Sequence, residues 1–245
     1  MSNRIRGVLQ YDGTSYRGWQ RQPDAPTVQE TCERALAEVL GEMVAVVAAG
    51  RTDTGVHARG QVVHFEHAGR LEPAEIHRAW NARLPRDVWV ERLEGAAPDF
   101  HARHDALRRT YRYYVAEGAR SRSPFVRRYA WAQVRALEWE PIEAATARLL
   151  GTHDFRRFAK GDGRGICTIM DARWDPTEEG RVLKITADRF LRHMVRAIVA
   201  ALVAVGRGRV PQEALGAALE EDGSRVPAGA APPHGLFLWK VEYDR

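Results

Sequence analysis

The stretch Gly50-Arg51-Thr52-Asp53-Thr54-Gly55-Val56-His57-Ala58 places a cation, a carboxylate, two hydroxyls and an imidazole beside two glycines. An apolar run (residues 43–49) precedes it, and a strand-like run (residues 61–66) follows it. Glycine suits positions where φ is positive or where another backbone approaches closely. The pattern therefore predicts a well-defined loop at the end of a sheet, a place where proteins often carry functional groups.

Asp53 is the candidate for chemistry in this loop. A carboxylate can serve as a nucleophile, a general base or a metal ligand, and Arg51 is close enough in sequence to keep it ionised. A tight turn with an aspartate cap and a surface arginine explains the same residues equally well. The loop alone does not decide between these interpretations.

The composition is that of an ordinary globular protein of 245 residues, with 44% hydrophobic and 28% charged residues. This length suits one large domain or two small ones. No apolar run approaches the roughly 18 residues of a membrane span, and residues 1–6 lack the apolar core of a signal peptide. Cys32 and Cys167 are too few for a disulfide framework or a four-ligand zinc site. A cytoplasmic location is therefore expected.

The charge balance indicates an anionic partner. The formal net charge is +5 and the sequence pI is about 9.5. Of the 37 basic residues, three are lysines, Lys160, Lys184 and Lys240. Arginine suits phosphates and bases, but biased base composition or thermal adaptation also explains its excess over lysine. The net positive charge, more than the arginine count, favours nucleic acid.

The hydropathy pattern predicts two successive βαββαβ units. In the first, strands are expected over residues 4–11, 44–49, 61–66 and 87–93, and the helices begin at a Thr27–Glu30 capping box and at Pro73. A connector follows over residues 95–109. In the second, strands are expected over residues 110–116, 167–174, 182–187 and 236–243, with helices from Pro141, over residues 190–205 and from Pro211.

This element order predicts an α+β fold of two tandem ferredoxin-like halves, with mainly antiparallel sheet flanked by helices. The expected division assigns residues 1–104, with the Asp53 loop, to the first half. Residues 105–245 then complete an RNA-binding cleft. Strand-rich units of this kind often bind looped or single-stranded RNA, although a fold analogy by itself assigns no function.

Several stretches, in chain order, give the sequence a resemblance to the TruA-type family of tRNA pseudouridine synthases. They are the Gly50–Ala58 stretch and residues 11–13 (YDG), 18–22 (GWQRQ), 27–30 (TVQE), 60–65 (GQVVHF), 81–85 (NARLP), 100–103 (FHAR), 109–113 (RTYRY), 151–155 (GTHDF), 190–196 (FLRHMVR) and 233–236 (PHGL). The resemblance covers nearly the whole chain. Residues 159–165 depart from it, because relatives often carry a longer Gln/Ser-rich loop there.

The resemblance implies the pseudouridine synthase fold and an isomerase that converts uridine to pseudouridine in the anticodon stem-loop of tRNA, at tRNA positions 38–40. It also implies a homodimer with tRNA lying across both subunits. The reaction breaks the N-glycosidic bond and rejoins the uracil through carbon, so no cofactor is expected. The sequence has no dinucleotide-binding or P-loop motif, which agrees with this expectation.

The same resemblance implies roles for four residues. Asp53 would start the reaction as a nucleophile or a base, and Arg51 would pair with it and fill the gap that a flipped nucleotide leaves. Tyr111 would stack on the target uracil, and Arg196 would be an active-site ion-pair partner of Asp53.

Further RNA contacts are expected from the connector and from a basic, glycine-rich segment at residues 156–165. The expected residues are Phe100, His101, Ala102, Arg103, His104, Lys160 and Arg164. His57, His64 and His67 match no familiar zinc spacing, so no metal is expected.

Two other kinds of protein fit parts of the sequence. One is a catalytically silent RNA-binding module on the same scaffold, for which Asp53 would be dispensable. The other is an aspartate-nucleophile phosphotransferase, because Asp53-Thr54-Gly55 is similar to an aspartyl-phosphate loop. That enzyme would need further carboxylates to gather magnesium, and none accompanies the motif.

Overall fold

The structure, a computed structural model, describes residues 3–160, 165–220 and 229–244. The chain forms two compact units. The first comprises Met1–Leu107 together with Leu238–Arg245, and the second comprises Arg108–Phe237. The chain thus leaves the first unit near the expected division and returns to it at Leu238. The two ferredoxin-like halves, divided after residue 104, stay a prediction.

The first unit follows the expected order of elements. These are β1 (Asn3–Tyr11), α1 (Val28–Leu40), β2 (Val47–Ala48), β3 (His57–His67), α2 (Pro73–Asn81) and β4 (Val88–Gly95), joined by the C-terminal part of β10 (Leu236–Tyr243). Strand β1 pairs antiparallel with both β3 and β4, and β2 pairs antiparallel with β3. Strand β2 is shorter than expected, while β3 begins earlier, at His57.

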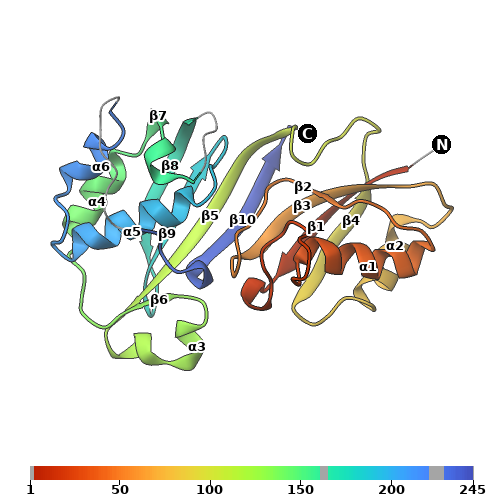
Figure 1. Cartoon of the computed structure of the whole chain (residues 1–245), viewed down its shortest axis with the longest axis horizontal. Helices are drawn as coiled ribbons and strands as arrows, with labels where there is room; N and C mark the ends of the chain where they lie inside the picture. The colour runs from red at the N-terminus through yellow and green to blue at the C-terminus, as the bar shows by residue number, and fades with distance from the viewer. Residues whose placement is uncertain (1–2, 161–164, 221–228, 245) are drawn as a thin grey trace. The chain divides into compact units, whose positions relative to one another are not determined.

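Helix α1 begins and ends where its caps predict. The hydroxyl of Thr27 accepts a hydrogen bond from the backbone N–H of Glu30, and Gly41 ends the helix in the left-handed conformation at φ 73°. The helix lies beside α2 (Figure 1), and the indole of Trp80 donates to the carbonyl of Cys32 at 3.1 Å. Cys32 is completely buried, which confirms its expected packing role.

The second unit contains more short elements than expected. Its elements are β5 (Ala106–Glu117), α3 (Pro124–Arg127), β6 (Trp131–Gln133), α4 (Trp139–Ala147), β7 (Gly151–Asp154), β8 (Ile166–Pro176), β9 (Gly180–Ala187), α5 (Met194–Gly206) and α6 (Glu213–Ala217). Strand β9 pairs antiparallel with β5 and β8, β7 pairs antiparallel with β8, and the short β6 runs parallel to β5. Mainly antiparallel strands flanked by helices confirm the α+β class.

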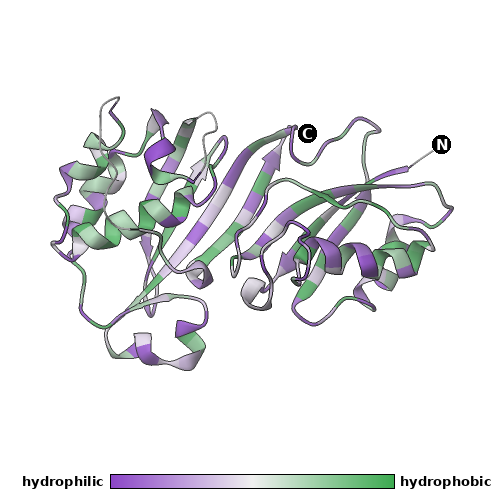
Figure 2. Cartoon of the chain, in the orientation of Figure 1, coloured by the Kyte–Doolittle hydropathy of each residue, from purple (hydrophilic) through white to green (hydrophobic). Residues whose placement is uncertain are grey.

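Helix α5 begins at Met194, four residues later than expected. His193 precedes it with φ 67°, a left-handed conformation that cannot continue an α-helix, so the apolar residues before it lie outside. The helix is hydrophobic along most of its length (Figure 2), and Arg196 is its one charged residue. Among the described residues, no helix combines the length and the apolar character that crossing a membrane requires.

Candidate active site

The Asp53 loop, residues 50–56, lies between β2 and β3, as predicted. Gly55 has φ 74°, the positive value that the glycine was expected to provide. Exposure alternates along the segment before it: Arg51 is exposed, Thr52 is 7% exposed and Asp53 is partly exposed. Arg51 and, in part, Asp53 are therefore open to solvent, while the residue between them is buried.

A second backbone segment lies directly behind this loop. The N–H of Trp19 donates to the carbonyl of Thr52 at 3.1 Å. Gly18 has φ 91°, and a Cβ atom at this position would lie 2.6 Å from the same carbonyl oxygen. Only glycine allows such a close approach, so the Gly18-Trp19 pair fixes the backbone that carries Asp53.

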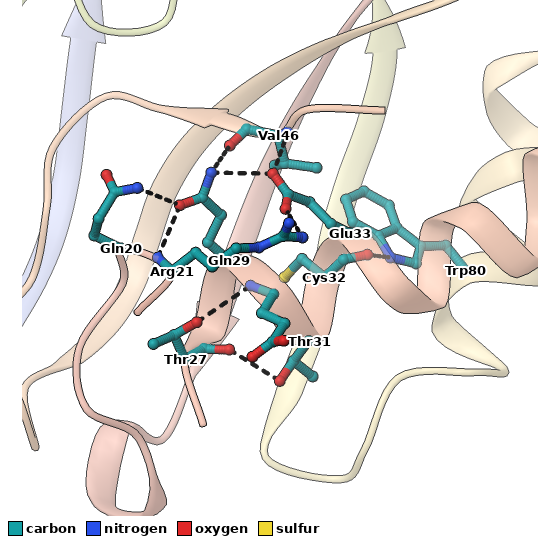
Figure 3. Close-up of polar contacts among 10 residues, drawn as sticks. Gln20, Arg21, Thr27, Gln29, Thr31, Cys32, Glu33, Val46 and Trp80 are labelled. Atoms are coloured by element: carbon teal, nitrogen blue, oxygen red, sulfur yellow. Dashed lines mark hydrogen bonds and ion pairs between the residues drawn. The ribbon is translucent and has the colours of Figure 1, made fainter. Parts of the chain in front are cut away.

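The segment behind the loop is anchored on helix α1 by the polar network of Figure 3. The Gln29 side-chain oxygen accepts hydrogen bonds from the backbone N–H of Arg21 (3.1 Å) and from the side chain of Gln20 (3.0 Å). Glu33, only 4% exposed, pairs with the Arg21 guanidinium and accepts from the N–H of Val46 at 2.9 Å. A buried carboxylate thus ties the segment to the helix and to the strand region before the loop.

The loop is also held from inside by two residues that sequence reasoning did not select. The hydroxyl of Tyr11 lies 2.8 Å from that of Thr52, and the side-chain amide of Gln61 donates to the carbonyl of Gly50 at 2.7 Å. Gln61 is completely buried. A polar residue inside the apolar run of β3 was the available signal, because buried amides need hydrogen-bond partners.

Tyr111 and Arg196 belong to the second unit. Tyr111 lies on β5, is 9% exposed, and meets the ring of Phe190 edge to face at a centroid distance of 5.1 Å. Arg196 lies in the first turn of α5, where its Nε atom donates to the carbonyl of Ala231 at 2.8 Å. The structure thus places Arg51 and Asp53 on one loop of the first unit, and Tyr111 and Arg196 on elements of the second.

Ala102 is the buried centre of the connector. Its N–H donates to Nδ1 of His64 at 3.1 Å, and its carbonyl accepts from the hydroxyl of Tyr243 at 2.6 Å. The residue is 0% exposed. Since its backbone groups are engaged and its methyl is covered, Ala102 anchors its neighbours within the unit.

The other expected connector contacts surround this anchor. Nδ1 of His101 accepts the backbone N–H groups of Arg103 and His104, each at 3.2 Å, and both of these residues are exposed. The ring of Phe100 packs beneath the guanidinium of Arg6 at 5.2 Å. The connector thus presents one cation and two imidazoles on a hydrogen-bonded turn.

The remaining expected RNA contacts lie in the second unit. Lys160 is exposed, and its backbone N–H donates to the carbonyl of Arg192 at 3.1 Å. Arg164 lies outside the described residues.

The three histidines of β3 each accept a backbone hydrogen bond within the first unit. Nδ1 of His57 and Nδ1 of His67 accept the N–H groups of Gly13 (3.0 Å) and Gly69 (3.3 Å), and His64 accepts that of Ala102. Within the part of the chain that the structure describes, no group of three or more His, Cys, Asp or Glu residues is arranged to hold a metal ion.

Comparisons with known proteins agree with these motifs. A protein-family model described as tRNA pseudouridine synthase matches residues 8–105 and 145–244. A relative named tRNA pseudouridine synthase A from Pelodictyon phaeoclathratiforme is 42% identical over 244 residues, covering 98% of this chain and 99% of the relative. Proteins of the same name from Chlorobium phaeovibrioides and Bacteroides thetaiotaomicron are 41% and 42% identical, covering 98% and 96% of this chain and 99% and 88% of their own lengths.

Proposed function

Because this chain belongs to the tRNA pseudouridine synthase family, we propose that it isomerises uridine to pseudouridine in the anticodon stem-loop of tRNA. The observation that carries the proposal is the Asp53 loop, which lies inside the matched residues and carries a partly exposed aspartate on a backbone held on two sides. Preorganised placement of a reacting group is a principal source of enzymatic rate.

Asp53 starts the reaction, as a nucleophile or as a base. The bond between the ribose carbon and N1 of uracil breaks, the base turns, and C5 bonds to the same ribose carbon. C5 loses a proton and N1 gains one, so the product is an isomer of the substrate. The balance requires no oxidant, reductant or cofactor.

Arg51 and Tyr111 assist the entry of the base. A uridine in a stacked stem must be flipped out to meet Asp53, at a cost of a few kcal/mol. The exposed side chain of Arg51, two residues from Asp53, fills the vacated space. Tyr111 stacks on the flipped uracil, an interaction worth about 1–3 kcal/mol. Arg196 acts as an ion-pair partner of Asp53.

The tRNA body binds to basic and imidazole side chains outside the site. His101, Arg103 and His104 contact phosphates on the connector, which Ala102 and Phe100 support from within, and Lys160 and Arg164 contribute from the second unit. Such contacts position RNA without reading its sequence and weaken with salt. The enzyme works in the cytoplasm as a homodimer across which one tRNA lies.

A single assay tests the activity. Purified protein and unmodified uridine-containing tRNA, with nothing else added, should yield pseudouridine at the anticodon stem-loop. Asp53→Asn should bind tRNA yet form no product. Binding by wild type without product would instead indicate a silent RNA-binding module, and near-normal turnover by Asp53→Asn would remove Asp53 from the mechanism. Light scattering that gives the mass of one 27.6 kDa chain would contradict the homodimer.

A further inference from the structure

The side chain of Thr52 is the inward-facing attachment of the Asp53 loop. Its hydroxyl oxygen lies 2.8 Å from that of Tyr11, and the two residues are 7% and 4% exposed. Thr52 is thus held inward between an exposed Arg51 and a partly exposed Asp53.

Gln61 supports this contact and adds a second attachment. Its amide nitrogen donates to the carbonyl of Gly50 at 2.7 Å and reaches the hydroxyl of Tyr11 at 3.4 Å. A carbonyl accepts only from the NH2 end of the amide, so the orientation of Gln61 is fixed. The Tyr11 oxygen thus lies within hydrogen-bond distance of both the Gln61 amide and the Thr52 hydroxyl. The loop is thus attached at Gly50 and at Thr52, on either side of Arg51. The second attachment lies one residue before Asp53.

A β-bulge places Tyr11 where it makes these contacts. Leu9 pairs with Gln61, but Tyr11 pairs with Ala58, so β3 contains one residue more than β1 over this stretch. In a regular ladder Tyr11 would lie opposite Arg59. Bulges redirect individual side chains and are over-represented next to active sites.

We propose that Tyr11 and Gln61 are positioning residues for Asp53, which act through Thr52 and the carbonyl of Gly50 to hold the loop in its reactive geometry. The inference rests on the proposed function, because it assigns their role relative to the reacting carboxylate. Neither residue needs to touch RNA. Their removal should slow the chemical step and leave tRNA affinity intact.

The first test removes one hydroxyl. Tyr11→Phe keeps the ring and loses the contact to Thr52, so its single-turnover rate should fall roughly tenfold to a hundredfold, as expected for a slightly displaced reacting group. The Kd for tRNA should stay within about twofold of wild type. Tyr16→Phe is the matched control: Tyr16 is 6% exposed, and its hydroxyl donates to Asp87 at 2.8 Å. This control should lose thermal stability to a similar extent but keep its rate.

The second test asks whether the Thr52 hydroxyl is the partner. Thr52→Val should slow single turnover as Tyr11→Phe does, whereas Thr52→Ser should restore most of the rate. Because one hydrogen bond links the two residues, the Tyr11→Phe, Thr52→Val double variant should be little slower than the slower single variant. A full rate in folded Tyr11→Phe, or equal slowing by Tyr16→Phe, would overturn the inference. Failure of wild-type protein to form pseudouridine would instead overturn the proposed function.

Discussion

The imidazole rings of His64 and His101 lie with their centroids 4.8 Å apart. Burial, followed by the charges of His101 and Arg4, lowers the pKa of His64 from 6.5 to about 4, although Glu66 and Asp105 oppose the shift. His64 is therefore neutral at physiological pH, the form in which its Nδ1 atom accepts a hydrogen bond from the connector.

Acid should weaken the first unit through His64. Between about pH 6.5 and pH 4, the unfolded chain binds a proton at this residue and the folded chain does not, so stability falls as the pH falls through this window. We expect His64 to contribute about 1–2 kcal/mol to that loss, after discounting for partial solvation. Urea unfolding at pH 7.5 and pH 4.5 measures it. His64→Asn, which keeps an acceptor near the Nδ1 position, should be less stable at pH 7.5 but lose less on acidification. An equal loss in both proteins would rule out His64 as the source.

Arg51→Ala should separate catalysis from binding. If Arg51 fills the space left by a flipped nucleotide, its loss should nearly abolish turnover on a paired uridine while distant cations preserve much of the affinity. Arg103→Gln should instead weaken binding and reduce the salt slope by about one phosphate contact. Affinities across a salt series, measured beside single-turnover rates, compare the two variants. Parallel losses of rate and affinity in Arg51→Ala would make Arg51 an ordinary phosphate contact.

Gly18→Ala should displace the loop and destabilise the protein. The new Cβ would lie 2.6 Å from the carbonyl oxygen of Thr52, in addition to the cost of φ 91°. Gly41→Ala supplies the control, because Gly41 has φ 73° and no atom within 4 Å of the added Cβ. The unfolding free energy of that control should fall by about 1–2 kcal/mol, because alanine is strained in the left-handed conformation. Gly18→Ala should lose more and also slow turnover. Equal losses of unfolding free energy in the two variants, measured by chemical denaturation, would show that the loop accommodates the added Cβ without cost.

Glu33→Gln should weaken the anchor shown in Figure 3. The amide keeps the shape of the carboxylate but removes the charge that pairs with Arg21. We therefore expect the free energy of unfolding to fall by about 1–3 kcal/mol. This is less than for a fully buried pair, because Arg21 is 45% exposed. Glu38→Gln on the same helix is the control, since the Glu38–Arg83 pair spans 3.7 Å on the surface. Its loss should be below about 1 kcal/mol. Urea midpoints that shift equally would contradict a structural role for the buried carboxylate.

Elements with strong local signals could be predicted from the sequence. Helix α1 has a capping threonine, an apolar stripe and a terminal glycine, and the structure confirms all three. The short strands β6 and β7 carry too few residues for a periodic pattern, and they exist because a neighbouring strand pairs with them. The predicted start of α5, at residue 190, was wrong. The left-handed conformation of His193 does not alter the apolar periodicity from which the helix was predicted.

Part of the candidate site could likewise be predicted from local sequence, and part could not. The position of the Asp53 loop between two strands follows from nearby glycines and hydrophobic runs. The roles of Tyr11 and Gln61 could not be found in this manner, because Tyr11 and Thr52 meet across 41 residues and Tyr11 is aimed by a bulge in a partner strand. Such contacts depend on register, which a one-residue insertion in a ladder changes.

The first unit is discontinuous, and this has a consequence for its synthesis. Chains generally fold domain by domain from the N-terminus as the ribosome extends them. Here the Asp53 loop is made early, yet its unit takes its last strand from residues beyond Leu238. The hydroxyl of Tyr243 bonds to the carbonyl of Ala102 across a separation of 141 residues. The nascent chain therefore cannot finish the unit that carries its reactive carboxylate until the whole second unit has been translated.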